Sequence, residues 1–122
     1  MSKSETIRDW GAGLQAFTQR NAGRRTILEE AHSAAAARAE ENDYPFRGVS
    51  WDARDGRVQI MLGEQGSVEL HLTRSIPAAR RIELLRSEGG RDRALRITHD
   101  EGQTLLRFVN DEAATRKARG GS

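Results

Sequence analysis

The sequence predicts an α+β protein in which one N-terminal helix packs on a strongly curled antiparallel meander of six or seven strands, a small, partly open barrel. Three observations support this prediction. Apolar residues recur at every second position in several runs between Val49 and Phe108, which is the period of strands with one buried face. Glycine-containing turn signals separate most of these runs. Ahead of them lies a stretch with apolar residues at helical spacing.

This N-terminal stretch predicts a helix over residues 5–20. Ser4 is suited to the N-cap position, and Asn21 to Gly23 is typical of a helix end. Gly11 and Gly13 each weaken a helix by about 1 kcal/mol relative to alanine, but they permit close approach of another element. The apolar stripe of this helix consists of Ile7, Trp10, Leu14 and Phe17.

The predicted sheet covers residues 25–109 and begins with a strand over Arg25–Glu30. The alanine-rich segment 31–41 fits either a helix or a return strand, and we favour the strand because the segment is short and leads directly into the meander. Asn42 to Pro45 is expected to be a loop. Together these elements place a single globular domain at residues 1–109 of the 122, and the polar segment 110–122 is expected to be a disordered tail.

Turn chemistry predicts the register of three hairpins. Asp55-Gly56 is a favoured pair for a two-residue type I′ turn, which places Trp51 opposite Ile60 and Val49 opposite Leu62. The next turn, at residues 63–67, pairs Leu62 with Val68 and Ile60 with Leu70. The last, at residues 100–102, pairs Leu95 with Leu106 and Ile97 with Thr104.

Composition excludes several classes of function. The 20 Lys and Arg residues nearly match the 18 Asp and Glu residues, and the two signs alternate, whereas a dedicated nucleic-acid binder concentrates basic charge. There is no cysteine, so disulfides, thiol catalysis and thiolate metal sites are excluded. With no signal pattern and no long apolar run, we expect a cytoplasmic protein without membrane contact.

The three histidines do not form a catalytic or metal-binding constellation. His32, His71 and His99 lie far apart in the sequence, without H-x-x-x-H or clustered-carboxylate spacing. No nucleophile stands beside them in the predicted sheet. The sequence therefore predicts a non-enzymatic protein with no metal and no cofactor.

Four segments resemble a family of small bacterial domains of unknown function. They read GVSWD at 48–52, VQIMLG at 58–63, ALRITH at 94–99 and GQTLLRF at 102–108, after a helix with one Trp and one Phe. The likeness covers about residues 5 to 109 and consists of turn and core residues. It implies a single-domain, cytoplasmic, bacterial protein and supplies no activity.

A second, partial resemblance concerns arginines at the end of the predicted helix. Arg20 and Arg24 form an R-x-x-x-R pair beside Arg25, and Asp43 to Gly48, which includes Arg47, spells D-x-P-x-x-G. PilZ receptors of cyclic-di-GMP are similar, with R-x-x-x-R followed by D/N-x-S-x-x-G, but Pro45 stands here in place of serine. Guanidinium groups clamp phosphates bidentately, so this resemblance implies a cyclic-dinucleotide site. The alternative is a charge cluster that interacts favourably with the helix dipole.

A second group of arginines suggests nucleic acid as another possible anion. These residues could form a basic patch for phosphate contacts, although few aromatic residues remain to stack on bases. The group consists of Arg80, Arg81, Arg86, Arg91, Arg93, Arg96 and Arg107.

Four apolar residues interrupt the alternation and fall on the outer face of the predicted strands. Either the helix covers them, or they form an exposed patch for another chain or a second copy. They are Met61, Leu85, Leu105 and Val109. The leading hypothesis is accordingly a non-enzymatic interaction module that contacts a protein partner or itself, and the alternative is an anion-binding module that uses the Arg20, Arg24 and Arg25 cluster.

Overall fold

The computed structural model describes residues 3–32, 38–63 and 71–109, with backbone alone for residues 32, 38–43 and 71. Within these residues, one helix and eight antiparallel strands confirm the α+β class. The elements are β1 (Lys3–Thr6), α1 (Trp10–Asn21), β2 (Arg25–His32), β3 (Arg38–Asp52), β4 (Arg57–Gly63), β5 (His71–Pro77), β6 (Ala79–Arg86), β7 (Asp92–His99) and β8 (Gly102–Phe108). The predicted tail at 110–122 lies outside the described residues.

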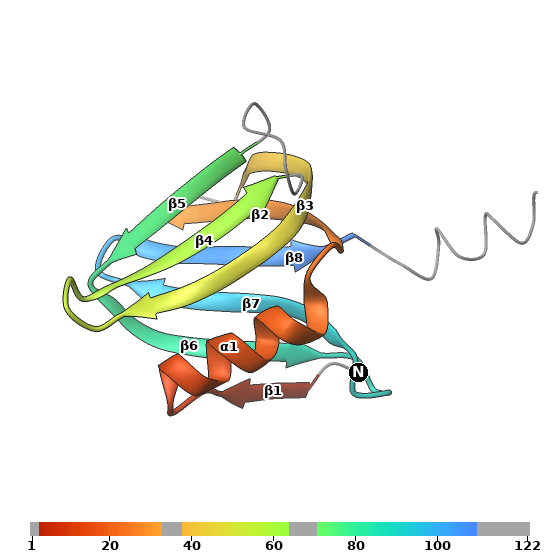
Figure 1. The fold of residues 1–122 in the computed structure, drawn as a ribbon, viewed down its shortest axis with the longest axis horizontal. Helices are drawn as coiled ribbons and strands as arrows, with labels where there is room; N and C mark the ends of the chain where they lie inside the picture. Colours follow the sequence, from red (N-terminus) through yellow and green to blue (C-terminus); the bar gives the residue numbers. More distant parts are fainter. Residues whose placement is uncertain (1–2, 33–37, 64–70, 110–122) are drawn as a thin grey trace, which may run out of the picture.

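The eight described strands follow the order β1-β6-β7-β8-β2-β3-β4-β5 (Figure 1). β1 and β5 are the two edges and do not pair with each other, so the sheet is open. The predicted count of six or seven strands was too low. It missed β1, because the predicted helix began at residue 5, inside this strand.

The helix begins later than predicted. Residues 5–9 are not helical: β1 pairs with β6, and Ile7 N–H donates to Ile82 O at 2.8 Å. Asp9, rather than Ser4, is the N-cap, and its carboxylate accepts from Ala12 N–H at 3.1 Å. An aspartate is as good an N-cap as a serine, so pairing of the preceding residues with a sheet edge decides between the two positions.

β3 is shared by two halves of the sheet, and α1 lies beside it (Figure 1). Residues 38–45 of β3 pair with β2, and residues 46–52 pair with β4. Where β2 no longer accompanies β3, the Thr18 hydroxyl of α1 donates to Val49 O at 3.1 Å and accepts from Val49 N–H at 3.0 Å. The helix thereby satisfies backbone groups that lack a neighbouring strand.

This arrangement corrects two local predictions. Asn42 to Pro45 belongs to β3 and is not a loop, because it pairs with the start of β2. Residues 38–41 are also strand, as favoured, while 33–37 lie outside the description. Gly13 does permit the expected close approach, since a Cβ there would collide with Ile7 Cγ2.

The first hairpin has a longer turn than predicted, which changes its register. Asp52 pairs with Arg57, so Trp51 faces Val58 and Val49 faces Ile60. The Asp52 carboxylate accepts from the backbone N–H groups of Arg54 and Asp55, at 3.1 and 3.2 Å. Gly56, at φ 68°, closes the four-residue turn. An aspartate side chain that organises its own turn thus outweighs the preference of Asp-Gly for a two-residue turn.

The second predicted register was wrong and the third was correct. Leu62 pairs with Leu72 and Ile60 with Arg74, whereas the predicted partners Val68 and Leu70 lie outside the described residues. In the last hairpin, the predicted partners are confirmed: Leu95 pairs with Leu106, and Ile97 with Thr104. A short turn leaves little freedom of register there.

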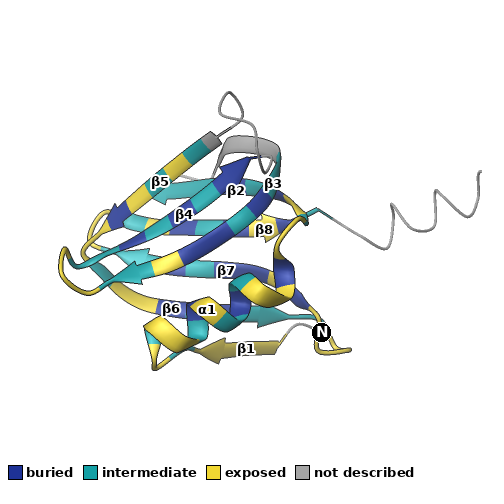
Figure 2. Cartoon of the chain, in the orientation of Figure 1, coloured by how far each residue is buried: buried dark blue, intermediate teal, exposed yellow. Residues whose placement is uncertain are grey.

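The core lies between the inner face of the curled sheet and α1, as the buried residues in Figure 2 indicate. Leu14 and Phe17 of α1 are fully buried against it. Phe17, Phe46 and Phe108 form an aromatic cluster with ring centroids 5.5 to 5.8 Å apart. At the other end of the helix, the Trp10 and Trp51 rings meet edge to face at 4.7 Å.

The single residue between β5 and β6, Ala78, adopts a backbone conformation that residues other than glycine rarely adopt. Ala78 has φ 57°, in the left-handed region, and is exposed. We expect Ala78→Gly to raise the free energy of unfolding by about 0.5–1 kcal/mol, measured by urea denaturation. Ala79→Gly, in β6, is the control and should lower it. Equal effects of the two substitutions would contradict the strain at Ala78.

Candidate functional site

Asp92, at the start of β7, is a buried carboxylate that ties the end of α1 to β6 and β7. Its Oδ2 accepts from Arg20 Nε at 2.8 Å and from Asn21 Nδ2 at 2.7 Å, and Oδ1 accepts from Arg86 Nε at 3.2 Å. Arg24 donates to the Asp92 backbone carbonyl at 2.8 Å, and its guanidinium carbon stands 4.0 Å from the centre of the Phe108 ring. Burial would raise the pKa of Asp92. The hydrogen bonds that its carboxylate accepts from Arg20, Asn21 and Arg86 outweigh this effect and lower the pKa.

The predicted anion-binding residues are only partly brought together. Gly23 N–H donates to Phe46 O, and Phe46 N–H donates to Arg24 O, both at 2.7 Å, so the two motif-bearing segments lie side by side. Arg20 and Arg24, however, direct their donors to Asp92. Arg25 pairs with Pro45 in the sheet, Arg47 lies at a bulge of β3, and the Asp43 side chain lies outside the description.

The second group of arginines is interspersed with carboxylates. Arg80 pairs with Asp100, and Arg86 reaches Glu5 at 3.0 Å in addition to Asp92. The nearest carboxylate oxygens to Arg81, Arg96 and Arg107 lie 3.9, 3.1 and 3.2 Å away. These five arginines are thus each paired with a carboxylate, within one strand for Arg81 and between segments for the others, so they do not form a continuous basic patch.

A polar chain crosses the inner face of the sheet near the β7–β8 turn. Glu101 N–H donates to His99 Nδ1 at 3.3 Å, so Nε2 carries the ring proton and donates to Thr104 Oγ1 at 3.1 Å. Thr104 donates in turn to Glu30 Oε1 at 3.1 Å. A hydrolytic triad needs a histidine that accepts from the nucleophile, and here the histidine donates to a fully buried hydroxyl. The chain is therefore structural.

Thr104→Val tests this chain. The substitution keeps the shape of the side chain but leaves His99 Nε2–H without its acceptor. It also removes the hydrogen bond to Glu30 Oε1, which then keeps its ion pair with Arg74 at 3.8 Å. We expect a loss of about 1–3 kcal/mol in the free energy of unfolding, by chemical denaturation. Thr73→Val, on the exposed side of β5, should change it by no more than about 0.5 kcal/mol. Equal losses would contradict a bonded role for Thr104.

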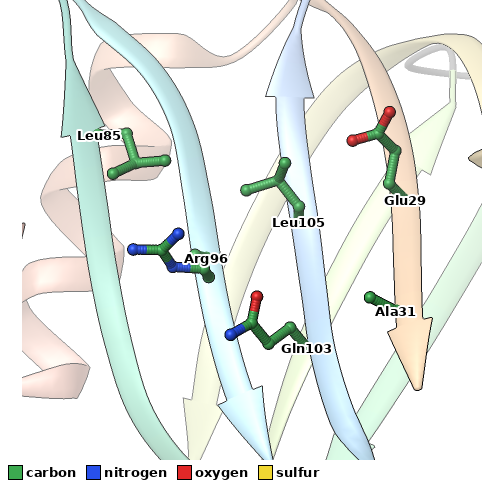
Figure 3. A pocket seen from close by; sticks show the side chains of 6 residues that line it. All are labelled: Glu29, Ala31, Leu85, Arg96, Gln103 and Leu105. Atoms are coloured by element: carbon green, nitrogen blue, oxygen red, sulfur yellow. The ribbon is translucent and has the colours of Figure 1, made fainter. Parts of the chain in front are cut away.

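The outer face of the sheet contains a shallow apolar hollow that spans four strands (Figure 3). Its volume is about 110 Å³. Leu85 of β6 and Leu105 of β8 are the two leucines of its lining, and both are half-buried. The full lining is Glu29, Ala31, Leu85, Arg96, Gln103 and Leu105.

Charged groups of opposite sign stand on the two sides of this hollow. Leu105 pairs with Arg96 of β7 on one side and with Glu29 of β2 on the other, so the three side chains lie on one rung. Arg96 Nε donates to Glu83 Oε1 at 3.1 Å, and this bond lowers the pKa of the Glu83 carboxyl. Arg107 donates to Glu29 at 3.2 Å. Glu83 and Arg107 do not line the hollow.

The structure separates the four apolar residues predicted to form one outer patch. Leu85 and Leu105 share the hollow, and α1 packs on the inner side of the sheet, so the helix does not cover them. Met61 instead lies beside α1: a Cβ on Gly48 would be 3.6 Å from Met61 Cε and 3.2 Å from Thr18 Cγ2. Val109, just after β8, donates its backbone N–H to Arg25 O at 2.9 Å.

The sequence analysis missed residues of two sites, the Asp92 cluster and the hollow. Asp92 comes directly after the β6–β7 turn, in an arginine-rich segment, and no apolar alternation marks it as buried. Glu29 and Ala31 join the hollow because β2 pairs with β8, a contact between distant segments. The alternation of β2 and β8 marks their outward residues, but only the strand order brings those residues together.

Comparisons with known proteins reveal no relative. No protein-family model matches the chain, and neither does any curated protein or solved structure. Among the described residues, no group of three or more His, Cys, Asp or Glu side chains is placed to hold a metal ion. No helix in this part of the chain has the length and apolar character needed to cross a bilayer.

Proposed function

We propose that this protein is a non-enzymatic interaction module that binds another protein chain through the outer face of β6, β7, β8 and β2. The observation that carries the proposal is the hollow in which Leu85 and Leu105 come together. Exposed apolar surface framed by charged residues is typical of protein-binding sites. The absence of cysteine is in keeping with a cytoplasmic location, and the family resemblance with a bacterial source.

The small size of the hollow and the ion pairs beside it favour a protein ligand. Small-molecule pockets commonly enclose about 300–1,000 Å³, well above the volume of this hollow. The apolar anchors of protein partners, by contrast, occupy small desolvated pockets within a polar rim. The Arg96–Glu83 and Arg107–Glu29 pairs supply such a rim.

The test is a selection of random twelve-residue peptides displayed on phage against the folded protein. We expect enriched peptides whose binding, measured by fluorescence anisotropy, weakens at least about tenfold in Leu105→Gln. Met61→Gln is the matched control, because Met61 is another half-buried apolar residue and does not line the hollow. Circular dichroism checks that both variants fold. If no peptide is enriched, or if Leu105→Gln leaves binding unchanged, the proposal is wrong.

A second candidate function is binding of a phosphate-bearing ligand at the end of α1. The observation in its favour is the backbone contact that brings Arg24 and Phe46, and with them the two arginine-bearing motifs, side by side. An amide-resolved NMR titration with a cyclic dinucleotide and a single-stranded oligonucleotide tests it. Shifts confined to residues 20–25 and 43–48 that persist at high salt would support a specific site, and shifts that salt abolishes would mean general charge attraction.

A further inference from the structure

We infer that the hollow receives one aliphatic side chain of its partner, which lies between an acidic residue on the β7 side and a basic residue on the β2 side. This inference rests on the proposed function, and it specifies the chemistry of the partner segment. Its three parts are the size of the hollow, its lining and the charges on its two sides.

The volume limits the anchor to one side chain of moderate size. A cavity of roughly 150 Å³ lined by apolar side chains holds benzene. The hollow is smaller, at about 110 Å³, and is lined by Leu85, Leu105 and Ala31. Leucine, isoleucine, valine or methionine therefore fits, whereas an indole ring exceeds the available space.

The single rung through Leu105 sets the polarity of the partner. Arg96 and Glu29 lie two strands apart, about 9–10 Å between their Cα atoms. An anchor above Leu105 would have Arg96 on one side and Glu29 on the other. Arg96 already donates to Glu83 through Nε, and Glu29 already accepts from Arg107, but neither Glu83 nor Arg107 lines the hollow. Within the hollow, a carboxylate can therefore share the Arg96 guanidinium, and an ammonium or guanidinium group can share the Glu29 carboxylate. The opposite order would bring like charges together, which disfavours it.

Synthetic versions of the enriched peptides test the anchor. The expected peptides share one aliphatic residue, with an acidic residue within four positions on one side and a basic residue on the other. Replacing the aliphatic residue with alanine should weaken binding at least about tenfold, and replacing a neighbouring uncharged residue should not.

Double-mutant cycles test the polarity. Arg96→Gln and replacement of the peptide's acidic residue with glutamine should be non-additive, with a coupling of about threefold in Kd. Glu29→Gln and the basic residue should be coupled likewise. Arg81→Gln is the control, because Arg81 also lies near Glu83 but does not line the hollow. It should show no coupling.

The possible failures are distinguishable. If peptides bind through Leu105 but share a tryptophan anchor, or show no coupling with Arg96 and Glu29, the inference about the partner is wrong and the proposed function stands. If binding does not depend on Leu105, both are wrong. The sequences of the peptides and their dependence on Leu105 are measured separately, so each outcome points to one conclusion.

Discussion

Asp92→Ala is expected to lower the free energy of unfolding by about 2–3 kcal/mol. The Asp92 carboxylate is 4% exposed and accepts hydrogen bonds from Arg20, Arg86 and Asn21. Without it, the buried Asn21 amide loses a partner, Arg20 loses its carboxylate at 2.8 Å, and Arg86 keeps Glu5 at 3.0 Å but loses its buried acceptor. The arginine side chains are 42% and 33% exposed, so water compensates for part of the loss and the effect stays below that of a fully buried pair. Urea denaturation measures the change.

Asp100→Ala is the matched control for this prediction. Asp100 also pairs with an arginine, Arg80, but the two side chains are 50% and 71% exposed. Exposed ion pairs contribute little, so we expect a change of no more than about 0.5 kcal/mol. A loss for Asp92→Ala as small as that of the control would show that the Asp92 cluster does not hold α1 to the sheet.

The same carboxylate predicts how stability depends on pH. The pKa of Asp92 in the folded chain lies below the ordinary value for aspartate. The contribution of Asp92 to the free energy of unfolding is therefore fully present above that ordinary value. It declines as the pH falls from the ordinary value to the folded pKa, because the unfolded chain binds the proton first. Asp92→Asn should flatten the acid limb of a stability–pH curve. Parallel curves for Asp92→Asn and the unsubstituted protein would contradict the assignment.

Phe17→Ala is expected to have a still larger effect, about 3–5 kcal/mol. Phe17 is fully buried, and its ring contacts those of Phe46 and Phe108, which come from β3 and β8. The substitution leaves a cavity where the helix meets both halves of the sheet. Thermal and urea denaturation measure the loss.

An exposed residue of the same helix supplies the control for Phe17. Gln15→Ala should change the free energy of unfolding by no more than about 0.5 kcal/mol, because Gln15 faces solvent. Phe17→Leu should lose less than Phe17→Ala, because more of the volume stays filled. A loss below about 1 kcal/mol for Phe17→Ala would mean that α1 does not depend on this contact.

The sequence predicts the fold class and much of the core, because burial of one face of a strand requires an apolar residue at every second position. The last hairpin was predicted in register, since its turn is short and both strands alternate cleanly. The first hairpin was not, because the Asp52 side chain bonds within the turn and lengthens it. β1 could not be predicted: its four residues are all exposed, so no apolar alternation marks them as a strand.

The candidate site was predictable only in part. Leu85 and Leu105 could be identified because each breaks an alternation, but the prediction grouped them with Met61, because periodicity does not contain the strand order that separates them. The arginine pair was found from its spacing, but its acceptor, Asp92, lies 72 positions from Arg20 in the chain. Contacts between such distant segments depend on the topology, and one sequence does not determine them by local pattern.

The strand order also has a consequence for how the protein folds. β2 to β5 and β6 to β8 each pair with their neighbours in sequence, whereas β2 and β8 join positions as distant as Glu29 and Arg107, 78 residues apart. Closing so long a loop has an entropic cost that sequential hairpins avoid. We therefore expect two meanders to form early and the β2–β8 seam to form late. Substitutions along that seam should speed unfolding while they leave the folding rate nearly unchanged.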